Sequence, residues 1–329
     1  MVSIRLFIPL SRLFWPPLAP NKLPSCKFFW PARTLNCYNF DQQSGGAALE
    51  LVQAKDFFSL ARRRVPIMML LLIAFIFGAV VGSFLNVCIA RIPKGQSIVH
   101  PPSNCPNCQA SIPFYCNVPL LSYVWLWGRC RYCKEPISSR YPIVELLTAL
   151  VSLALMHRFG PSYAFFVTFL FAAALIVISF IDLDVRIVPD VISLPGIVLG
   201  LVLAIIGYFI FDGATSFIPS PLSSLIGILA GGGFLLATAW IYEKITGVEG
   251  MGGGDIKLLA MIGAFLGWPS VPVTLFFASL VGSVVGLACM LMTGAGRRLA
   301  LPFAPFLCSG AVLFIFYGEE LIRFYLPPG

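Results

Sequence analysis

The stretch MMLLLIAFIFGAVVGSFLNVCIA, residues 68–90, runs for 23 residues without a charge. A helix of this length crosses about 30 Å of hydrocarbon. The whole chain is similar in character, because 58% of its 329 residues are hydrophobic and only 11% are charged. Soluble domains carry roughly a quarter charged residues, and a single soluble core could not bury so much apolar surface. The composition therefore predicts a membrane protein and excludes a soluble globular one.

Seven further apolar runs follow the first one. They cover residues 141–157, 161–181, 191–211, 221–242, 256–268, 271–292 and 299–317. Segments of alternating hydrophobicity, as found in membrane barrels, are not visible, so a bundle of helices is favoured. We predict an all-α polytopic membrane protein with about eight transmembrane helices. The fifth and sixth runs have the weakest helix signal, because glycines interrupt or precede them.

A small polar domain separates the first two spans. Residues 91–140 carry six bases, one acid and five of the ten cysteines. If this domain is cytoplasmic, the loops on its side hold eleven bases: Arg91, Lys94, Arg129, Arg131, Lys134, Arg140, Arg186, Lys244, Lys257, Arg297 and Arg298. The opposite side, counted from residue 68, holds only Arg158 and Arg323. Because basic loops stay in the cytoplasm, this asymmetry predicts a cytoplasmic domain at 91–140.

The first 67 residues have a different composition. They contain nine bases and three acids, which supply +6 of the formal net charge of +8, so the remainder is nearly neutral. Because the basic residues are not gathered on a folded domain, no nucleic-acid surface is implied. Arg62, Arg63 and Arg64 would also lie on the outer side of the first span, against the charge rule. We expect residues 1–67 to be an extension outside the working protein, with translation beginning at Met68 or Met69. The alternative is a genuine extension of unknown purpose.

Four acids fall where spans meet the cytoplasmic edge. Asp182, Asp184 and Asp190 lie in FIDLDVRIVPD, residues 180–190, and Asp255 precedes the sixth span. Charges at membrane depth are costly, so each is a functional candidate. Two carboxylates from different helices, with no histidine nearby, suggest an aspartic-protease arrangement in which the pair shares one proton. The alternative is that these acids solvate loop ends or neutralise Arg186 and Lys257.

The glycines before Asp255 suggest a loop at the active site. Gly252, Gly253 and Gly254 would allow a substrate backbone to approach and could adopt positive φ, and Lys257 follows in the same stretch. We group these four residues as the expected active-site loop. Close packing of helices would also explain three glycines.

The polar domain contains two CxxC pairs that predict a metal site. Cys105 and Cys108 form the first pair, and Cys130 and Cys133 form the second, with 21 residues between them. This spacing suits four thiolates around one tetrahedral Zn²⁺, which would be structural because four ligands close its coordination. Disulfides are the rival interpretation, although a reducing cytoplasm disfavours them. Cys116 is a fifth cysteine, for which packing is expected.

Six motifs in the same order resemble the bacterial prepilin peptidases, also called type IV leader peptidases. They are GSFLNVCIARIP (82–93), the CxxC pairs, NVPLLSYVWLWGRCRYC (117–133), ISSRYPIVE (137–145), FIDLDVRIVPD (180–190) and EGMGGGDIKLLAMIGAFLGW (249–268). The resemblance covers residues 78 to about 310. It implies three domains. Residues 68–90 would form a first transmembrane helix, residues 91–140 a four-cysteine zinc-knuckle domain, and residues 141–329 a seven-helix membrane aspartic peptidase domain.

The resemblance also implies an activity. The family removes the basic leader from type IV prepilins and type II secretion pseudopilins on the cytoplasmic side of the bacterial inner membrane. Many members then methylate the new N-terminus with S-adenosylmethionine. The resemblance implies that Asp182 and Asp255 are catalytic, with Asp184 and Asp190 as secondary acids, and that Gly128 and Arg129 serve methyl transfer. Pro302-Phe303-Ala304-Pro305 departs from the family's usual Pro-Phe-Gly-Pro, which puts only local packing in doubt.

Two other classes of function fit parts of the sequence. A proton-coupled transporter could use Asp182 and Asp255 as a relay, but its coupling acids should lie near the bilayer midplane. A membrane thiol oxidoreductase could use the CxxC pairs, but these would be needed on the oxidising side. Cleavage of a prepilin by the purified protein would separate the three.

Overall fold

The structure is a computed structural model. It describes residues 25–29, 34–38, 54–105, 107–113, 118–211, 217–247, 252–293 and 302–325. The chain divides into two units, Met1–Met69 and Leu70–Gly329. In the first, strands β1 (Ser25–Phe29) and β2 (Thr34–Tyr38) form an antiparallel pair in which Lys27 lies opposite Asn36. The other residues before 54 lie outside the described part, so the expectation for residues 1–67 stays a prediction.

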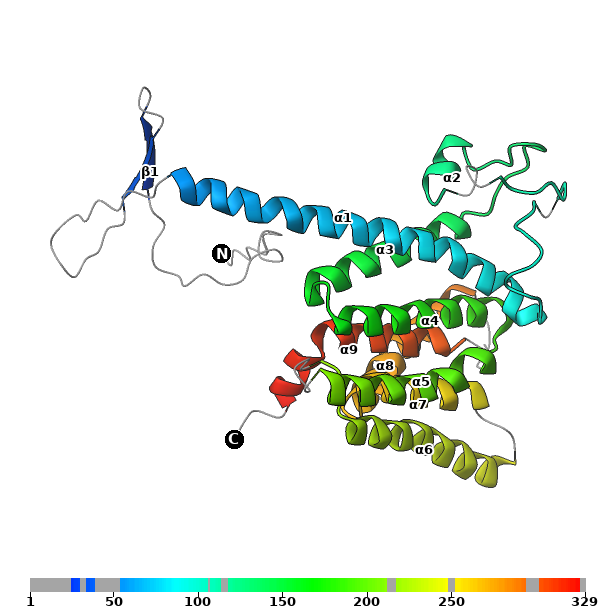
Figure 1. The fold of residues 1–329 in the computed structure, drawn as a ribbon. Coiled ribbons are helices and arrows are strands. Elements are labelled where there is room, and N and C mark those ends of the chain that lie inside the picture. The colour runs from blue at the N-terminus through cyan, green and yellow to red at the C-terminus, as the bar shows by residue number, and fades with distance from the viewer. Residues whose placement is uncertain are drawn as a thin grey trace, which may run out of the picture. The chain divides into compact units, whose positions relative to one another are not determined.

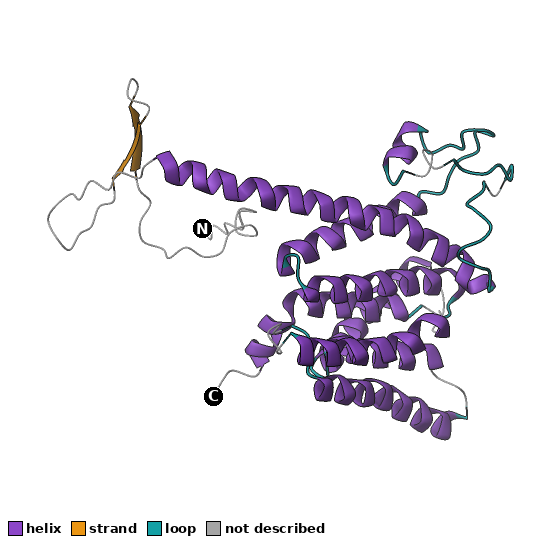
Figure 2. Cartoon of the chain, viewed as in Figure 1, coloured by secondary structure: helices purple, strands orange, loops and turns teal. Residues whose placement is uncertain are grey.

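The described residues from 54 onward contain helices and no strand, which confirms the all-α prediction for the membrane part (Figure 2). The helices are α1 (Ala54–Arg91), α2 (Leu121–Trp125), α3 (Arg140–Phe159), α4 (Tyr163–Val185), α5 (Asp190–Ile210), α6 (Pro221–Thr246), α7 (Gly253–Leu266), α8 (Ser270–Thr293) and α9 (Ala304–Tyr325). A 3-10 turn at Ile92–Lys94 ends the first span.

All eight predicted apolar runs form helices, but the helices differ in length. Among the described residues, six stretches are long and apolar enough to cross a membrane: Ile67–Lys94, Arg140–Phe159, Tyr163–Val185, Asp190–Ile210, Pro221–Thr246 and Ser270–Met292. The predicted sixth span corresponds to α7, which has 14 residues and is about 21 Å long at 1.5 Å per residue. It is therefore shorter than the hydrocarbon layer. The apolar part of α9, Ala304–Gly318, is also short.

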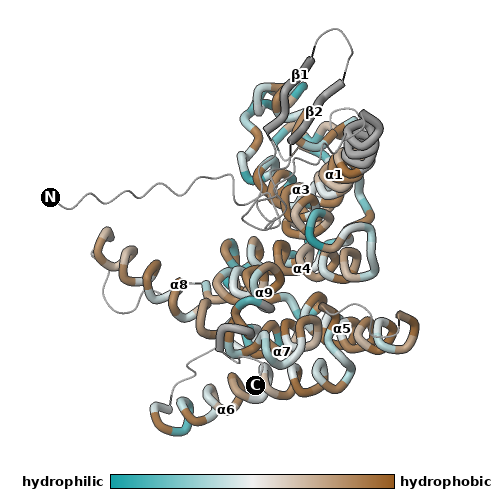
Figure 3. The backbone as a smooth tube through the Cα atoms, turned by 90° about the vertical axis from the view of Figure 1, so that its left-hand side faces the viewer, coloured by the Kyte–Doolittle hydropathy of each residue, from teal (hydrophilic) through white to brown (hydrophobic). Residues whose placement is uncertain are grey.

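The core of the membrane unit lies around α4, α7 and α9. In α4, 72% of the most apolar stretch is buried, whereas in α8 only 6% is buried. Large side chains such as Phe171, Met261 and Leu307 are fully buried in this core. Figure 1 shows α4 between α3 and α9. Apolar residues continue onto the outer faces of the helices (Figure 3), as expected for surfaces that meet lipid.

Glycines allow α7 to lie directly against α6. A Cβ atom added at Gly263 of α7 would lie 2.1 Å from the carbonyl oxygen of Gly227 in α6. One turn further along α6, a Cβ at Gly231 would lie 2.6 Å from the carbonyl oxygen of Leu259. Small residues of this kind let helix backbones touch within membranes. Gly231, one of the glycines that weakened the helix prediction, thus helps to fix the position of α7.

Gly263→Ala is expected to destabilise the protein by about 1–3 kcal/mol, because backbone atoms cannot make room for the new methyl group. Gly233→Ala is the matched control, since a Cβ at Gly233 of α6 would meet no atom within 4 Å. Thermal unfolding of the two variants in lipid nanodiscs measures the difference. Equal midpoints for the two variants would show that the crossing of α6 and α7 is loose.

Candidate active site

Asp182 lies in the last turn of α4, and its side chain is held by the last helix. This residue is only 5% exposed. The backbone N–H of Ala304, the first residue of α9, donates a hydrogen bond of 3.1 Å to Asp182 Oδ2. At the main chain, Arg186 adopts a left-handed conformation and its N–H donates to the Asp182 carbonyl oxygen at 2.9 Å, which ends α4. The carboxylate is therefore fixed between two helix ends.

Asp255 reaches the same place from the first turn of α7. Gly252 precedes the helix in an extended conformation, and its carbonyl oxygen accepts a hydrogen bond from the Asp255 N–H at 3.2 Å. The carboxyl group of Asp255 interacts electrostatically with that of Asp182. The fold thus brings two acids into electrostatic range of each other although they are 73 positions apart in the sequence (255 − 182 = 73).

The expected active-site loop is mostly helical. Only Gly252 precedes α7, while Gly253, Gly254 and Lys257 lie within it. The expectation of positive φ is wrong for these glycines, because the positive-φ glycines among the described residues lie elsewhere. A Cβ at Gly254 would lie 2.8 Å from Val188 Cβ, whereas Gly252 and Gly253 face open space. Gly254 is therefore needed for close packing, and the other two leave room beside Asp255.

Two contacts at this site were not predicted from the sequence. The Ala304 N–H donates to Asp182, so the Ala304 position contacts a candidate catalytic acid, and the expectation that its substitution affects only local packing was too narrow. A backbone donor does not depend on the side chain, which explains why alanine is compatible there. Cys308, buried one turn further along α9, interacts electrostatically with both Asp182 and Asp255. Pro305, at the second position of α9, is the sequence signal for this helix start.

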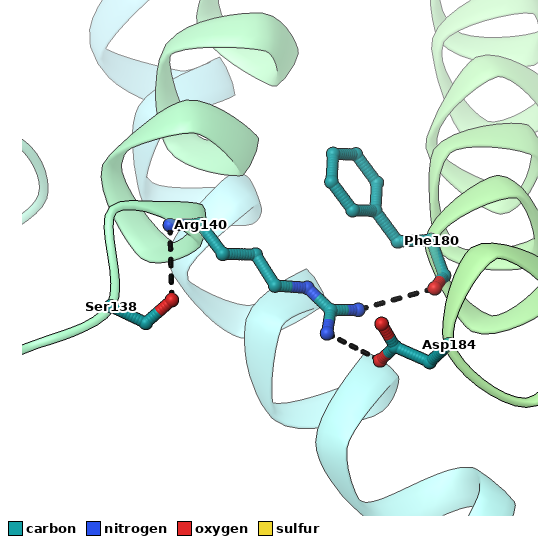
Figure 4. Close-up of polar contacts among 4 residues, drawn as sticks. All are labelled: Ser138, Arg140, Phe180 and Asp184. Carbon is teal, nitrogen blue, oxygen red and sulfur yellow. Dashed lines mark hydrogen bonds and ion pairs between the residues drawn. The ribbon is translucent and has the colours of Figure 1, made fainter. Parts of the chain in front are cut away.

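Asp184 forms an ion pair with Arg140, which joins the end of α4 to the beginning of α3 (Figure 4). The Arg140 guanidinium also donates to the Phe180 carbonyl oxygen at 3.2 Å and lies 5.4 Å from the centre of the Phe180 ring. The Arg140 N–H donates to Ser138 Oγ at 3.3 Å. Asp184 therefore pairs with Arg140. The sequence had suggested Arg186 as its partner.

Asp190 is paired in a similar way with Lys257. The Lys257 ammonium donates to both Asp190 carboxylate oxygens, at 2.7 and 2.8 Å. This ion pair joins the first turn of α5 to α7. Lys257 therefore neutralises Asp190, as the alternative interpretation of the sequence proposed. Each of the two secondary acids connects a pair of helices that carry or flank Asp182 and Asp255.

Asp184→Asn is expected to cost about 0.2–1 kcal/mol of stability, because the ion pair with Arg140 is partly exposed to solvent. Cleavage should fall by less than about tenfold, which at most corresponds to about 1.4 kcal/mol. Arg140→Gln should have a similar effect, and the double variant should be little worse than either single variant, because both changes remove the same contact. Thermal unfolding and cleavage rates measure this. If Asp184→Asn lowered the cleavage rate as much as Asp182→Asn, Asp184 would have a direct catalytic role.

The four predicted cysteines form one cluster. The sulfur atoms of Cys105, Cys108, Cys130 and Cys133 all lie within 4.8 Å of one another. The sulfurs of Cys105 and Cys133 are 3.8 Å apart. Four sulfurs at about 2.3 Å from a tetrahedral centre would be separated by about 3.8 Å, so this four-cysteine cluster fits a zinc ion. Cys116 lies outside the described residues.

The two CxxC pairs have the same local structure, offset by 25 residues. In the first, the Cys105 N–H donates to Ala110 O at 3.0 Å, and in the second, the Cys130 N–H donates to Glu135 O at 2.8 Å. Gln109 and Lys134 each adopt positive φ at the corresponding position. The backbone N–H groups of Cys133 and Tyr132 lower the pKa of the Cys130 thiol to about 6. Because thiolates are the metal-binding form, this turn prepares Cys130 to bind a cation.

Gly128 has a structural reason to be glycine. Its φ is +66°, and a Cβ atom there would lie 2.9 Å from Tyr123 Oη. Its N–H donates to Tyr123 O at 2.9 Å, and its carbonyl oxygen accepts from the Ile137 N–H at 2.7 Å. These bonds connect α2 to the second cysteine pair. Arg129 follows with an exposed side chain, so the implied role of both residues in methyl transfer stays a prediction.

Two family models match the chain. One describes the bacterial peptidase A24 N-terminal domain and matches residues 76–159, and the other describes the type IV leader peptidase family and matches residues 169–287. A prepilin leader peptidase/N-methyltransferase from Aeromonas hydrophila is 36% identical over 278 residues, which cover 77% of this chain and 93% of the relative. The chain belongs to the type IV leader peptidase family.

Other members with the same description are similarly related. The Pseudomonas aeruginosa protein is 35% identical over 76% of this chain and 91% of its own length. The Myxococcus xanthus protein is 42% identical over 68% of this chain and 64% of its own length. No solved structure matches the chain. The comparisons confirm the resemblance to the bacterial prepilin peptidases, and they give no support to the transporter alternative.

Proposed function

We propose that this membrane enzyme cleaves the basic leader from type IV prepilins or type II secretion pseudopilins, with Asp182 and Asp255 as its catalytic acids. The observation that carries the proposal is that these two carboxyl groups, from α4 and α7, are close enough to interact electrostatically, while a backbone donor at Ala304 holds one of them. The relatives are prepilin leader peptidase/N-methyltransferases, and they suggest the substrate class.

The pair has the components that an aspartic peptidase needs. One carboxylate takes a proton from water while the water oxygen bonds to the scissile carbonyl carbon, and the protonated partner donates to the carbonyl oxygen. Collapse of this intermediate breaks the C–N bond, and the leaving amine receives a proton from the pair. Gly252 and Gly253, which face open space, leave room for the substrate backbone beside Asp255.

The site is proposed to face the cytoplasm of a bacterial inner membrane. Asp182 ends α4 and Asp255 begins α7, while Arg140 and Lys257 lie at the same helix ends through their ion pairs. The excess of Lys and Arg in the loops on this side supports a cytoplasmic location for it. The basic leader of the substrate would stay on this side, and its apolar segment would enter the bilayer.

Zinc and a methyl donor complete the proposed function. The four-cysteine cluster would hold one structural Zn²⁺, which cross-links a domain with little core of its own. Methylation of the new N-terminus would use S-adenosylmethionine, and the exposed guanidinium of Arg129 has the charge to bind the carboxylate of this donor. Gly128 would hold Arg129 in place through its two backbone bonds.

An assay with purified protein, a synthetic prepilin and a labelled methyl donor tests the proposal. Cleavage and methyl incorporation are scored separately, the latter also on a substrate that is already cleaved. The expected result is a product shortened by the leader and labelled at its N-terminus. An intact prepilin after prolonged incubation, together with proton uptake into vesicles, would favour the transporter instead.

A further inference from the structure

An apolar surface of the four-cysteine domain has no role in the function proposed above. Residues 118–127, VPLLSYVWLW, carry no charge and include helix α2. The exposed fractions are 85% for Trp125, 88% for Trp127, 69% for Leu121 and 71% for Val124. We refer to these four residues as the α2 surface. Two tryptophans with this exposure would be poorly placed if they faced only water.

A hydrogen bond fixes the start of α2 to the first turns of α3. The N–H of Leu120, the residue before α2, donates to Glu145 Oε2 at 2.8 Å. Glu145 is 8% exposed and lies five residues after Arg140, where α3 begins. Five residues correspond to about 7 Å along a helix. Because α3 is one of the six candidate spans, the start of α2 is tied to a point within the first turns of a candidate span, and Figure 1 shows α2 beside the beginning of α3.

The charges around the α2 surface fit anionic lipid. Exposed basic residues follow it directly, Arg129 two positions after Trp127 and Lys134 in the next turn. The domain as a whole, residues 91–140, has six bases against Glu135 as its one acid. Tryptophans at headgroup level beside Lys and Arg are typical of segments that lie in the membrane interface, and basic residues there attract the anionic cytoplasmic leaflet.

We propose that the α2 surface inserts into the headgroup region of the cytoplasmic leaflet and binds anionic phospholipid. Trp125 and Trp127 lie among the upper acyl chains, and the exposed ammonium group of Lys134 contacts lipid phosphates. The bond between Leu120 and Glu145 holds α2 at this depth. The four-cysteine cluster and Gly128 are consequently kept at the lipid surface. This proposal needs no substrate, so it stands or falls independently of the peptidase activity.

Quenching of tryptophan fluorescence by brominated lipids tests the proposal. The full chain and its Trp125→Phe/Trp127→Phe variant are placed in nanodiscs of phosphatidylglycerol and phosphatidylcholine, with or without bromine near the headgroup. The chain has six tryptophans, so the difference between the two proteins isolates the α2 signal. Trp240→Phe provides the reference, because Trp240 is 59% exposed on α6, one of the candidate spans.

Bromine is expected to quench the α2 signal by at least half the fraction found for Trp240, and aqueous iodide should quench it little. The single variants Trp125→Phe and Trp127→Phe give the same information if the double variant does not fold. Strong iodide quenching without bromine quenching would overturn the proposal. Protection from iodide only after addition of a prepilin would also overturn it, in favour of a protein-binding surface.

Discussion

The rate of leader cleavage is expected to fall by about 10³-fold or more when Asp182 or Asp255 is replaced with Asn, since a positioned acid or base contributes about 10²–10⁴-fold. Asn preserves the size of each side chain and removes the carboxyl proton. Asp182→Asn retains an acceptor for the Ala304 N–H, so insertion and folding should be unaffected. Cleavage of a synthetic prepilin, measured over hours, gives the rate.

Three controls separate this chemistry from a general loss of structure. The double variant Asp182→Asn/Asp255→Asn should be about as slow as either single variant, because residues that act as one unit are not additive. Asp190→Asn, which removes the partner of Lys257, should retain most activity. Methylation of a substrate without its leader should continue in all of them. Near-normal cleavage by either single variant would refute the assignment.

Loss of the metal is expected to unfold the four-cysteine domain, because residues 91–140 are too few to support a core of their own. Cys105→Ser and Cys130→Ser should each abolish zinc binding, while Cys289→Ser, outside the cluster, should keep one zinc per chain. Elemental analysis of the purified proteins measures this. Proteolysis between residues 91 and 140 should rise sharply in the two cluster variants and in protein treated with a chelator.

Methyl transfer and leader cleavage should respond differently to loss of the metal. Methyl transfer should decrease by about tenfold or more, the effect expected when the support of a site is disturbed, whereas cleavage by Asp182 and Asp255 should decrease less. A purified chain with four reactive thiols, no zinc and an intact four-cysteine domain would contradict the prediction. An equal loss of both activities would show that the domain also positions the peptidase site.

Much of the fold was predictable from the sequence because the membrane imposes a simple length rule. Uncharged runs located the helices, and two CxxC spacings located the four-cysteine cluster. The length and packing of α7 were harder to predict. Its apolar run does not indicate that close contact between Gly227 and Gly263 would hold a 14-residue helix against α6. Contacts between backbones leave little trace in hydropathy.

The sequence was enough to select the candidate acids but not to predict their contacts. Asp182 and Asp255 were selected because a charge at membrane depth is costly. The pairing of Asp184 with Arg140, 44 residues earlier, depends on how α3 packs against α4, which spacing alone does not reveal. Similarly, the Ala304 donor is a main-chain group, and every residue except proline has one.

The bond between Ala304 and Asp182 also bears on when the enzyme becomes active during its synthesis. The donor lies 122 residues after the acid, at the start of the final described helix. A nascent chain that has inserted α1 to α8 therefore holds both acids but lacks the contact that positions the first. With the catalytic role proposed for Asp182, the chain is expected to become able to cleave a prepilin only when α9 has completed the core beside α4, and a chain truncated before residue 304 should be inactive.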